Sequence, residues 1–352
     1  MQRVPKILSV GELAQVTFYQ WSALEACALK GLMGSLQLDI ELPIVPPSRA
    51  TLVGQFHHKA MELAATVNSD TELDAGIESA IRDLQVEVNQ WPHLRKVGSA
   101  SGWGEVNASA SLAIRIVSAR NVDGRDILKR VEQVLHSSDR VLVGKPDYFA
   151  ISSRQAYLRE HKSGPIRESD GQIMQVHLDQ LHYYAALMLD NYDVDSVVGQ
   201  LKSLNGDTFD TVVGKGEAAT LKARVGRLIT AVNERIRAGI APVALATSSV
   251  EACSFCRVRT ICPTFKREQD SLGLEGDQYL VEGQVTRITP SANGAVVDLS
   301  ILDEFRKVEV AIGVPSGAVT EMRFGQRCQL SGLRRRGTAL EWSHTSRALH
   351  CE

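Results

Sequence analysis

The stretch from Leu142 to Gly164, LVGKPDYFAISSRQAYLREHKSG, constrains the fold of this chain more than any other part of it. Its alternation of apolar and polar residues on either side of a polar turn predicts two short antiparallel strands. Asp147 lies on the first strand. Glu160 and Lys162 are two residues apart on the second strand, so their side chains point to the same face. We therefore expect two carboxylates and one ammonium group to converge on this hairpin.

Two interpretations of these charges are open at this point. Two acids on neighbouring strands suit a hard divalent cation with oxygen ligands, and a nearby ammonium group can hold a phosphate or orient an attacking water. That arrangement is suited to cutting phosphodiester bonds. The alternative is a solvated hairpin whose charges happen to alternate, because short charged motifs recur by chance.

The composition narrows the class of protein. The chain has 352 residues, which is enough for two domains, and its net charge of −2 argues against a generally cationic coat for nucleic acid. A local basic groove is still compatible with this charge. The N-terminus shows no signal-peptide pattern, and no apolar run approaches the roughly 18 residues of a membrane span. We expect a cytoplasmic protein without a membrane partner.

Three of the six cysteines crowd into ten residues, at Cys253, Cys256 and Cys262. A reducing cytoplasm disfavours disulfides, so this spacing indicates a metal or iron–sulfur site. Three thiolates are one short of the usual four, and Cys27 is the distant candidate for the fourth. Such a site would join the two ends of one domain. Zinc stays open as the alternative metal, and chance proximity and an ordinary buried thiol at Cys27 stay open as the alternatives to any site.

Apolar periodicity predicts an α/β (α+β) fold for the first three quarters of the chain. The expected helices cover residues 17–33, 51–66, 73–90, 108–119, 169–190 and 217–238. From residue 131 the period changes to that of strands, and the hairpin is expected to belong to a three-stranded meander, so the sheet should be antiparallel where the acids lie. A further strand is expected at residues 197–204.

The last 75 or so residues have the pattern of a small all-β domain. The expected strands cover residues 279–288, 295–302, 306–312, 327–333 and 339–343, with a short helix near residues 319–322. This order fits a closed barrel of the OB type. The basic run Arg334-Arg335-Arg336 is expected in a loop, with Arg323 and Arg327 nearby. OB barrels often bind single strands through such loops, and a solvated turn is the alternative.

Taken in chain order, the motifs resemble those of the PD-(D/E)xK nucleases of the RecB type. The resemblance points to the iron–sulfur subgroup that includes CRISPR-associated exonucleases and the nuclease domains of AddAB-type helicase–nucleases. It covers residues 17–265 and rests on Gly54-x3-His58-x2-Met61-Glu62, Gly144-Lys-Pro-Asp147, Glu160-His-Lys162-Ser-Gly164, Gln180-x3-Tyr184 and the four cysteines. Each motif alone is weak, and their shared order and spacing carry the resemblance.

The resemblance implies a restriction-endonuclease-like core with helices around a mixed sheet. It implies a site for Mg²⁺ or Mn²⁺ whose ligands are His58, Asp147, Glu160 and the backbone carbonyl of His161. Lys162 would lie beside the scissile phosphate and the attacking water. A hard cation prefers these carboxylate oxygens, so the chemistry of the residues agrees with the resemblance.

The same resemblance assigns roles on the neighbouring helices. Gln180 and Tyr184 would contact the DNA backbone or hold the site in shape. The family spacing from Gly54 selects His58 and not His57 as the ligand. The four cysteines named above would bind an iron–sulfur cluster of the 4Fe–4S type, with zinc as the alternative. Ala28 departs from the proline that usually follows the first cysteine, and Leu24 departs from an aromatic residue before it, but neither is a ligand.

We therefore expect a metal-dependent DNA nuclease, an exonuclease acting on single-stranded DNA or DNA ends, in repair, recombination or defence. The alternative is a catalytically weak DNA-binding or assembly subunit of a helicase–nuclease or defence complex, with a helicase or CRISPR-related protein as partner. The expected domains are a nuclease domain at residues 1–265, a linker at 266–277 and the barrel at 278–352. Removal of residues 277–352 is expected to leave the nuclease fold intact.

Overall fold

The computed structural model describes residues 2–350 except 42–46, 68, 121–127, 132, 153, 255, 275, 277, 293, 302–307 and 344–345. By its internal contacts the chain forms two compact units. We call Ala14–Tyr19 with Pro47–Ile229 the sheet unit, and Met1–Leu13 with Gln20–Pro46 and Thr230–Glu352 the barrel unit. This division does not test the domain boundaries expected from the sequence, which remain a prediction. Within the described residues, no helix is long and apolar enough to cross a membrane.

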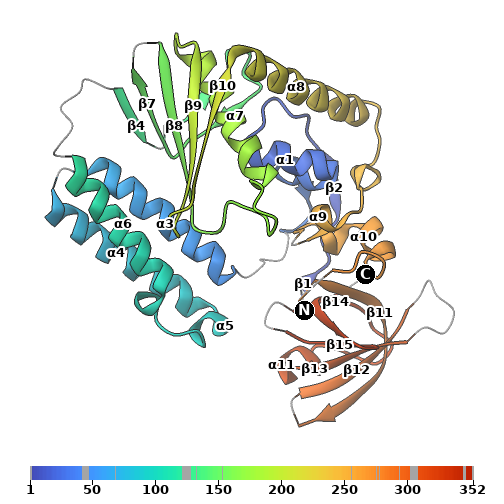
Figure 1. The fold of residues 1–352 in the computed structure, drawn as a ribbon. Coiled ribbons are helices and arrows are strands. Elements are labelled where there is room, and N and C mark those ends of the chain that lie inside the picture. Colours follow the sequence, from blue (N-terminus) through green and yellow to red (C-terminus); the bar gives the residue numbers. More distant parts are fainter. Residues whose placement is uncertain are drawn as a thin grey trace. The chain divides into compact units, whose positions relative to one another are not determined.

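The sheet unit is built on a five-stranded mixed sheet in the order β10-β9-β8-β7-β4 (Figure 1). Its strands are β4 (Leu128–Val131), β7 (Tyr148–Ser152), β8 (Gln155–Lys162), β9 (Ser196–Ser203) and β10 (Thr208–Gly214). The predicted hairpin is present, because β7 and β8 pair antiparallel; Ser153 of the expected turn lies outside the described residues. β8 pairs in parallel with β9. The sheet is thus antiparallel on one side of β8 and parallel on the other.

The expected meander is split into two sheets, which corrects the sequence prediction. β5 (Leu135–His136) and β6 (Val143–Gly144) form a separate two-stranded sheet, and β4 is the antiparallel partner of β7. Pro146 comes two residues after the end of β6, and a proline has no amide proton with which to continue the strand pairing. The break lets the chain turn before Asp147, so this acid lies at the entrance of β7.

One long helix, α7 (Gln175–Asn191), packs on the face of the sheet formed by β8 and β9 (Figure 1). It begins six residues later than expected. Gly171, at φ +87°, and an isolated antiparallel bridge between Arg167 and Ile173 form a turn where the first helical residues were predicted. The buried side of α7 carries both Gln180 and Tyr184.

Three further helices of the sheet unit form a bundle with its own apolar core. These helices are α3 (Arg49–Thr66), α4 (Asp70–Gln90) and α6 (Gly104–Arg120). Ser48 and Ser69 cap the first two, since each serine hydroxyl accepts a hydrogen bond from a backbone amide of the first turn. α3 contacts β8 and β4, which brings the first motif to the sheet. α5 (Pro92–Arg95) follows α4, and α8 (Lys215–Arg237) follows β10.

The barrel unit contains the cysteine segments and the C-terminal strands. Its first part consists of β2 (Ile7–Val10), most of α1 (Phe18–Ala26), α2 (Ala28–Gly31), β3 (Leu36–Leu38), α9 (Val250–Cys253) and α10 (Pro263–Glu268). β2 and β3 pair antiparallel. Cysteines from both ends of this part lie in one buried apolar cluster with Leu29, Phe265 and Leu280.

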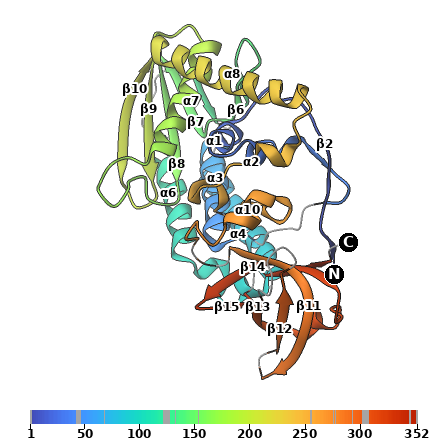
Figure 2. The same cartoon turned by 90° about the vertical axis from the view of Figure 1, so that its right-hand side faces the viewer.

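The C-terminal strands close into a five-stranded barrel, which confirms the expected fold class (Figure 2). They are β11 (Tyr279–Ser291), β12 (Gly294–Ser300), β13 (Val308–Val314), β14 (Arg327–Arg336) and β15 (Ala339–Glu341), with α11 (Ser316–Val319) after the third. Closure results because β14 pairs with both β11 and β15, while β15 pairs in parallel with β13. These pairings are those of an OB barrel.

Two short terminal strands, which the sequence did not predict, extend the barrel sheet. β16 (Arg347–His350) pairs with β14, and β1 (Gln2–Arg3) pairs in parallel with β16, so the two ends of the chain lie side by side (Figure 2). The basic run Arg334–Arg336 ends strand β14 and does not form a loop. Because β14 begins at Arg327, this arginine lies at the other end of the same strand from the basic run.

Candidate active site

The two predicted acids lie next to each other in the sheet unit. The backbone amide of Asp147 donates a hydrogen bond to Oε1 of Glu160 at 3.2 Å. The amide of His161 donates to Oδ2 of Asp147 at 2.8 Å. Both carboxylates are buried, with 8% of Asp147 and 1% of Glu160 exposed. The hairpin therefore holds two acids together away from water, which a solvated hairpin would not do.

Lys162 completes the triplet that the hairpin predicted. Its Nζ lies 3.6 Å from Oε2 of Glu160 and donates a hydrogen bond to Oε1 of Gln180 at 2.6 Å. Only 11% of the lysine side chain is exposed. Gln180 reaches Lys162 from α7, because Glu160 and Lys162 point to the face of the sheet on which that helix packs. The helix thus fixes the ammonium group next to the acids.

His58 joins the acids from the helix α3. Its Nδ1 lies 3.0 Å from Oδ1 of Asp147, and 41% of its side chain is exposed. The neighbouring His57 points elsewhere, since its Nδ1 lies 3.0 Å from the hydroxyl of Ser109 on α6. The structure therefore separates the two histidines in the way that the family spacing selected. Glu62, one turn after His58, pairs with Lys59 and not with the acids.

The side chain of His161 faces the other side of the sheet, where its ring centre lies 5.8 Å from that of His57. Burial lowers the pKa of His57 to about 4 and that of His161 to about 3, so both rings are neutral at pH 7. Within the described part of the chain, Nε2 of His57 and Nδ1 of His161 have no hydrogen-bond partner. Only the backbone of His161 reaches the acids.

The two carboxyl groups have opposite pKa shifts. Burial raises the pKa of Glu160 well above its usual range, and the charge of Asp147 raises it further. Burial alone would also raise the pKa of Asp147, but its hydrogen bond to His58, the charge of that histidine and the amide of His161 outweigh burial and lower it. Asp147 is therefore the ionised member of the pair, and a cation between the two groups would favour ionisation of Glu160 as well.

Tyr184 lies behind Gln180, to which its phenol is hydrogen-bonded. It is 6% exposed, and burial raises its pKa far above the usual range of a phenol. A methyl group on Gly144 would come within 2.7 Å of the Tyr184 ring, so the glycine of the second motif lets strand and helix approach. Tyr183, which the sequence analysis missed, donates a hydrogen bond to the carbonyl of Val16 at 2.5 Å. This bond ties α7 to the start of α1.

A pocket of about 220 Å³ opens beside the acids. It is lined by the end of β8, by α1, α3 and α7, and by the segment after β8; Tyr19, His58, Lys162 and Gln180 are among its residues. The site that the sequence predicted therefore borders a space that a substrate can enter. Tyr19 and His177 also line this pocket and were not singled out in the sequence, because neither belongs to a motif.

The donor set fits a hard divalent cation. Asp147 contacts both His58 and Glu160, and carboxylates and a histidine nitrogen are ligands that Mg²⁺ or Mn²⁺ accepts. As the side chains stand, no group of three or more His, Cys, Asp or Glu among the described residues is spaced to hold a metal ion. A bound cation would therefore require side-chain movements.

The four cysteines predicted as cluster ligands are buried in the same apolar core of the barrel unit, and among the described residues no three of them are spaced to hold a metal ion. Cys27, Cys253, Cys256 and Cys262 are 6–8% exposed, are free thiols and belong to one buried cluster. Backbone amides donate to two of the sulfurs, from Thr247 to Cys27 at 3.5 Å and from Phe265 to Cys262 at 3.4 Å. Burial raises the pKa of Cys256 to about 11. Such thiols ionise at neutral pH only beside a metal.

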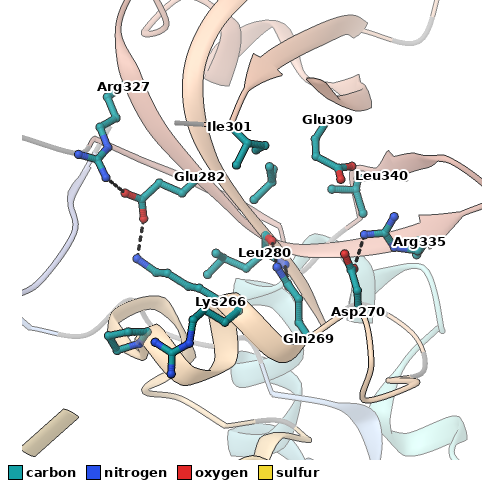
Figure 3. A pocket seen from close by; sticks show the side chains of 13 residues that line it. Lys266, Gln269, Asp270, Leu280, Glu282, Ile301, Glu309, Arg327, Arg335 and Leu340 are labelled. Atoms are coloured by element: carbon teal, nitrogen blue, oxygen red, sulfur yellow. Dashed lines mark hydrogen bonds and ion pairs between the residues drawn. The ribbon is translucent and has the colours of Figure 1, made fainter. Parts of the chain in front are cut away.

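A larger cavity of about 370 Å³ lies in the barrel unit, between α10 and the barrel (Figure 3). Lys266 pairs with Glu282 at 2.5 Å, and Glu282 pairs with Arg327 at 2.7 Å. On the other side of the cavity, Arg335 pairs with Asp270 at 2.6 Å (Figure 3). None of the predicted catalytic residues lines it.

Comparison with known proteins agrees with this geometry. The profile of the PD-(D/E)XK nuclease superfamily matches residues 15–263, more than half of the chain and including all three residues of the hairpin triplet. The chain belongs to the PD-(D/E)XK nuclease superfamily. Membership in this superfamily indicates a nuclease that acts on nucleic acid and typically uses a divalent metal ion.

Two other comparisons add little to the assignment. No curated protein matches the chain significantly. A solved structure titled "Crystal structure of SSO0001" is similar over 69% of this chain and 95% of that chain, at 13% sequence identity and a TM-score of 0.26. The superfamily assignment therefore rests on the sequence profile alone.

Proposed function

We propose that this superfamily member is a metal-dependent deoxyribonuclease that degrades single-stranded DNA or DNA ends. One observation carries the proposal: the Lys162 ammonium lies 3.6 Å from the buried Glu160 carboxylate, beside Asp147 and on the wall of an open pocket. Two buried acids that meet a histidine and a lysine beside an open pocket favour a cation site over a structural role.

Each residue of the site would have a separate role. Asp147, Glu160 and His58, with the carbonyl of His161, would hold Mg²⁺ or Mn²⁺, which supplies positive charge at the attacking and leaving oxygens. Lys162 would hold a non-bridging phosphate oxygen, and Gln180 keeps its ammonium group in place. Water adds to phosphorus as one phosphorus–oxygen ester bond breaks, which leaves a phosphate monoester and a free hydroxyl group.

Replacement of one ligand tests this function. Asp147→Ala should abolish the degradation of end-labelled single-stranded DNA in Mg²⁺ or Mn²⁺, a loss beyond the roughly 10–100-fold typical of outer-shell changes. Asp210→Ala, which removes an exposed carboxylate on β10, is the matched control and should cut like the wild type. Equal degradation by wild type and Asp147→Ala would refute the catalytic proposal and favour the alternative of a DNA-binding or assembly subunit.

We further propose that the four buried cysteines bind an iron–sulfur cluster of the 4Fe–4S type. Their burial in one cluster, and the amides that donate to two of the sulfurs, support such a site, because these hydrogen bonds tune the clusters. Protein purified without oxygen should be brown, and Cys256→Ser should lose the colour and much of its solubility. Cys328 is a buried cysteine of the barrel, so the Cys328→Ser variant should keep the brown colour and the solubility. Colourless protein that contains zinc would refute the iron–sulfur assignment.

The barrel would help this nuclease to hold a single strand. Phe324, in the turn before β14, is 81% exposed, and the neighbouring Arg323 is exposed as well. Exposed aromatic rings next to basic side chains are the features with which OB barrels hold single strands. A helicase or a defence protein as partner stays a prediction from the resemblance.

A further inference from the structure

The pocket beside the acids is lined by side chains of two chemical kinds. Polar groups such as those of His58, Lys162 and Gln180 line it, and so do the apolar residues Phe18, Tyr19, Pro165 and Val176. A nucleotide also combines two kinds of group, a charged phosphate and a planar base. Apolar residues are not needed to hydrolyse a phosphate ester, so their presence requires another explanation.

Tyr19 is the exposed aromatic residue among the apolar residues that line the pocket. Its side chain is 65% exposed although it lines the pocket, whereas the preceding Phe18 is 1% exposed. An exposed ring contributes little to the core, so the stability of the fold does not account for a tyrosine at this position. Tyr19 lines the same pocket as Lys162 and Gln180, so it lies beside the proposed phosphate-binding group.

The ring is held by a rigid support. Tyr19 meets Phe18 edge to face, with ring centres 5.3 Å apart, and Phe18 meets Tyr183 in the same way at 5.9 Å. The segment before α1 is fixed as well, because Val16 exchanges backbone hydrogen bonds with Val141 and Val143 at 2.9 and 3.0 Å. A ring that is already ordered loses little conformational entropy when a flat ligand stacks on it.

We propose that Tyr19 forms a stacking platform for a DNA base adjacent to the phosphate that Lys162 holds. This inference rests on the proposed nuclease function and adds a base-binding subsite to it. Stacking uses the face of a base and not its hydrogen-bonding edge, so the platform accepts every base. It also requires an unpaired base, because the faces of a base in a duplex are covered by its neighbours. The subsite therefore selects single-stranded DNA or frayed ends.

Binding experiments with three variants test the platform. A single strand that carries 2-aminopurine at one position would be bound in Ca²⁺, and its fluorescence, which stacking quenches, would be followed. Tyr19→Ala should weaken binding about tenfold and abolish quenching at one position, since stacking on one base is worth roughly 1–3 kcal/mol. Tyr19→Trp should retain both. Tyr157→Ala, which removes an exposed ring on the opposite face of β8, should behave like the wild type.

An abasic scan keeps the test independent of the folding of any variant. With wild-type protein, an abasic nucleotide should weaken binding most at the position where 2-aminopurine is quenched, and this sensitivity should disappear in Tyr19→Ala. The proposed stacking role of Tyr19 would be refuted if the wild type bound equally well with the abasic nucleotide at every position. It would also be refuted if Tyr19→Ala bound the strand and quenched 2-aminopurine like the wild type. Wild-type protein that neither binds nor cuts single strands would instead refute the nuclease function itself.

Discussion

The acid pair shows how one site gives two identical functional groups different properties. Asp147 takes hydrogen bonds from His58 and an amide, and its pKa falls, whereas Glu160 is more deeply buried and its pKa rises. Without a bound metal ion, burial and the charge of Asp147 disfavour the ionised form of Glu160 more than Lys162 favours it. A bound divalent cation would offset this cost.

Glu160→Gln should therefore stabilise the metal-free protein at neutral pH. Because folding raises the pKa of Glu160, its contribution to stability is complete below the unfolded pKa of about 4.3 and is lost as the pH rises through the folded value. The gain in the variant should be absent near pH 4 and should grow towards pH 8, by about 1.4 kcal/mol for each pKa unit between the folded and unfolded protein.

Urea unfolding in a chelator, from pH 4 to pH 8, measures this difference. The same variant should lose the stabilisation that Mn²⁺ gives the wild type, because the remaining carboxamide is a poor ligand for a hard cation. If the wild type is still more stable than Glu160→Gln at pH 8, the ionised Glu160 side chain does not lower the free energy of unfolding of the metal-free protein.

For single residues, strand alternation and motif spacing are local properties, so the sequence alone could suggest His58, Lys162 and Gln180, which lie beside the acids or next to each other among the described residues. Tyr19 and Tyr183 could not be found in this way. Their roles depend on the packing of α1 against α7, which joins positions more than 160 residues apart. Exposure also decides the difference between Phe18 and Tyr19, and adjacent aromatic residues in a sequence do not reveal which one is buried.

Among the elements, the contact between β6 and α7 depends on a single glycine. A Cβ atom on Gly144 would lie 2.7 Å from Cε1 of Tyr184 and 2.9 Å from Cδ1 of Leu187. Tyr184 and Leu187 are buried, so neither can move away freely. Gly144→Ala should therefore push α7 from the strand, destabilise the sheet unit by about 1–3 kcal/mol and lower activity by displacing Gln180.

Gly164→Ala is the matched control, because a Cβ atom on this glycine of the third motif meets nothing within 4 Å. Its midpoint of urea unfolding should be close to that of the wild type. If Gly144→Ala unfolds at the same urea concentration as Gly164→Ala, close approach is not the reason for a glycine in the second motif.

The errors in the predicted elements have local causes that the sequence contained. The strand β10 was missed although Asn205-Gly206 lies in the turn between β9 and β10, and such a pair is a strong hairpin signal. The late start of α7 follows from Asp170-Gly171, another turn pair, which the helical period concealed. The terminal strands β1 and β16 are different, because two- and four-residue strands acquire their pairing only from the finished barrel.

For the whole molecule, the main result is that the barrel and the cysteine segments share one unit. The sequence suggested a separable barrel, since the strand pattern changes abruptly after residue 277. The structure places Leu280 of β11 in the cysteine cluster, and the Gln269 side chain makes two hydrogen bonds to the Leu280 backbone, at 2.6 and 2.8 Å. The pair Lys266 and Glu282 joins α10 to the same strand (Figure 3).

Leu280→Ala should consequently weaken the proposed metal site as well as the barrel. Leu280 is 2% exposed, and truncation of such a leucine costs about 2–5 kcal/mol. The cavity would open beside Cys262 and Phe265, so a chelator should remove the metal faster, and a thiol reagent should label the metal-free cysteines faster. Leu330→Ala removes a leucine that is equally buried but belongs to the barrel core, so it should lower stability without either effect. Equal rates of metal loss in the two variants would mean that the barrel is separable, and that residues 277–352 can be removed without harm to the cysteine cluster.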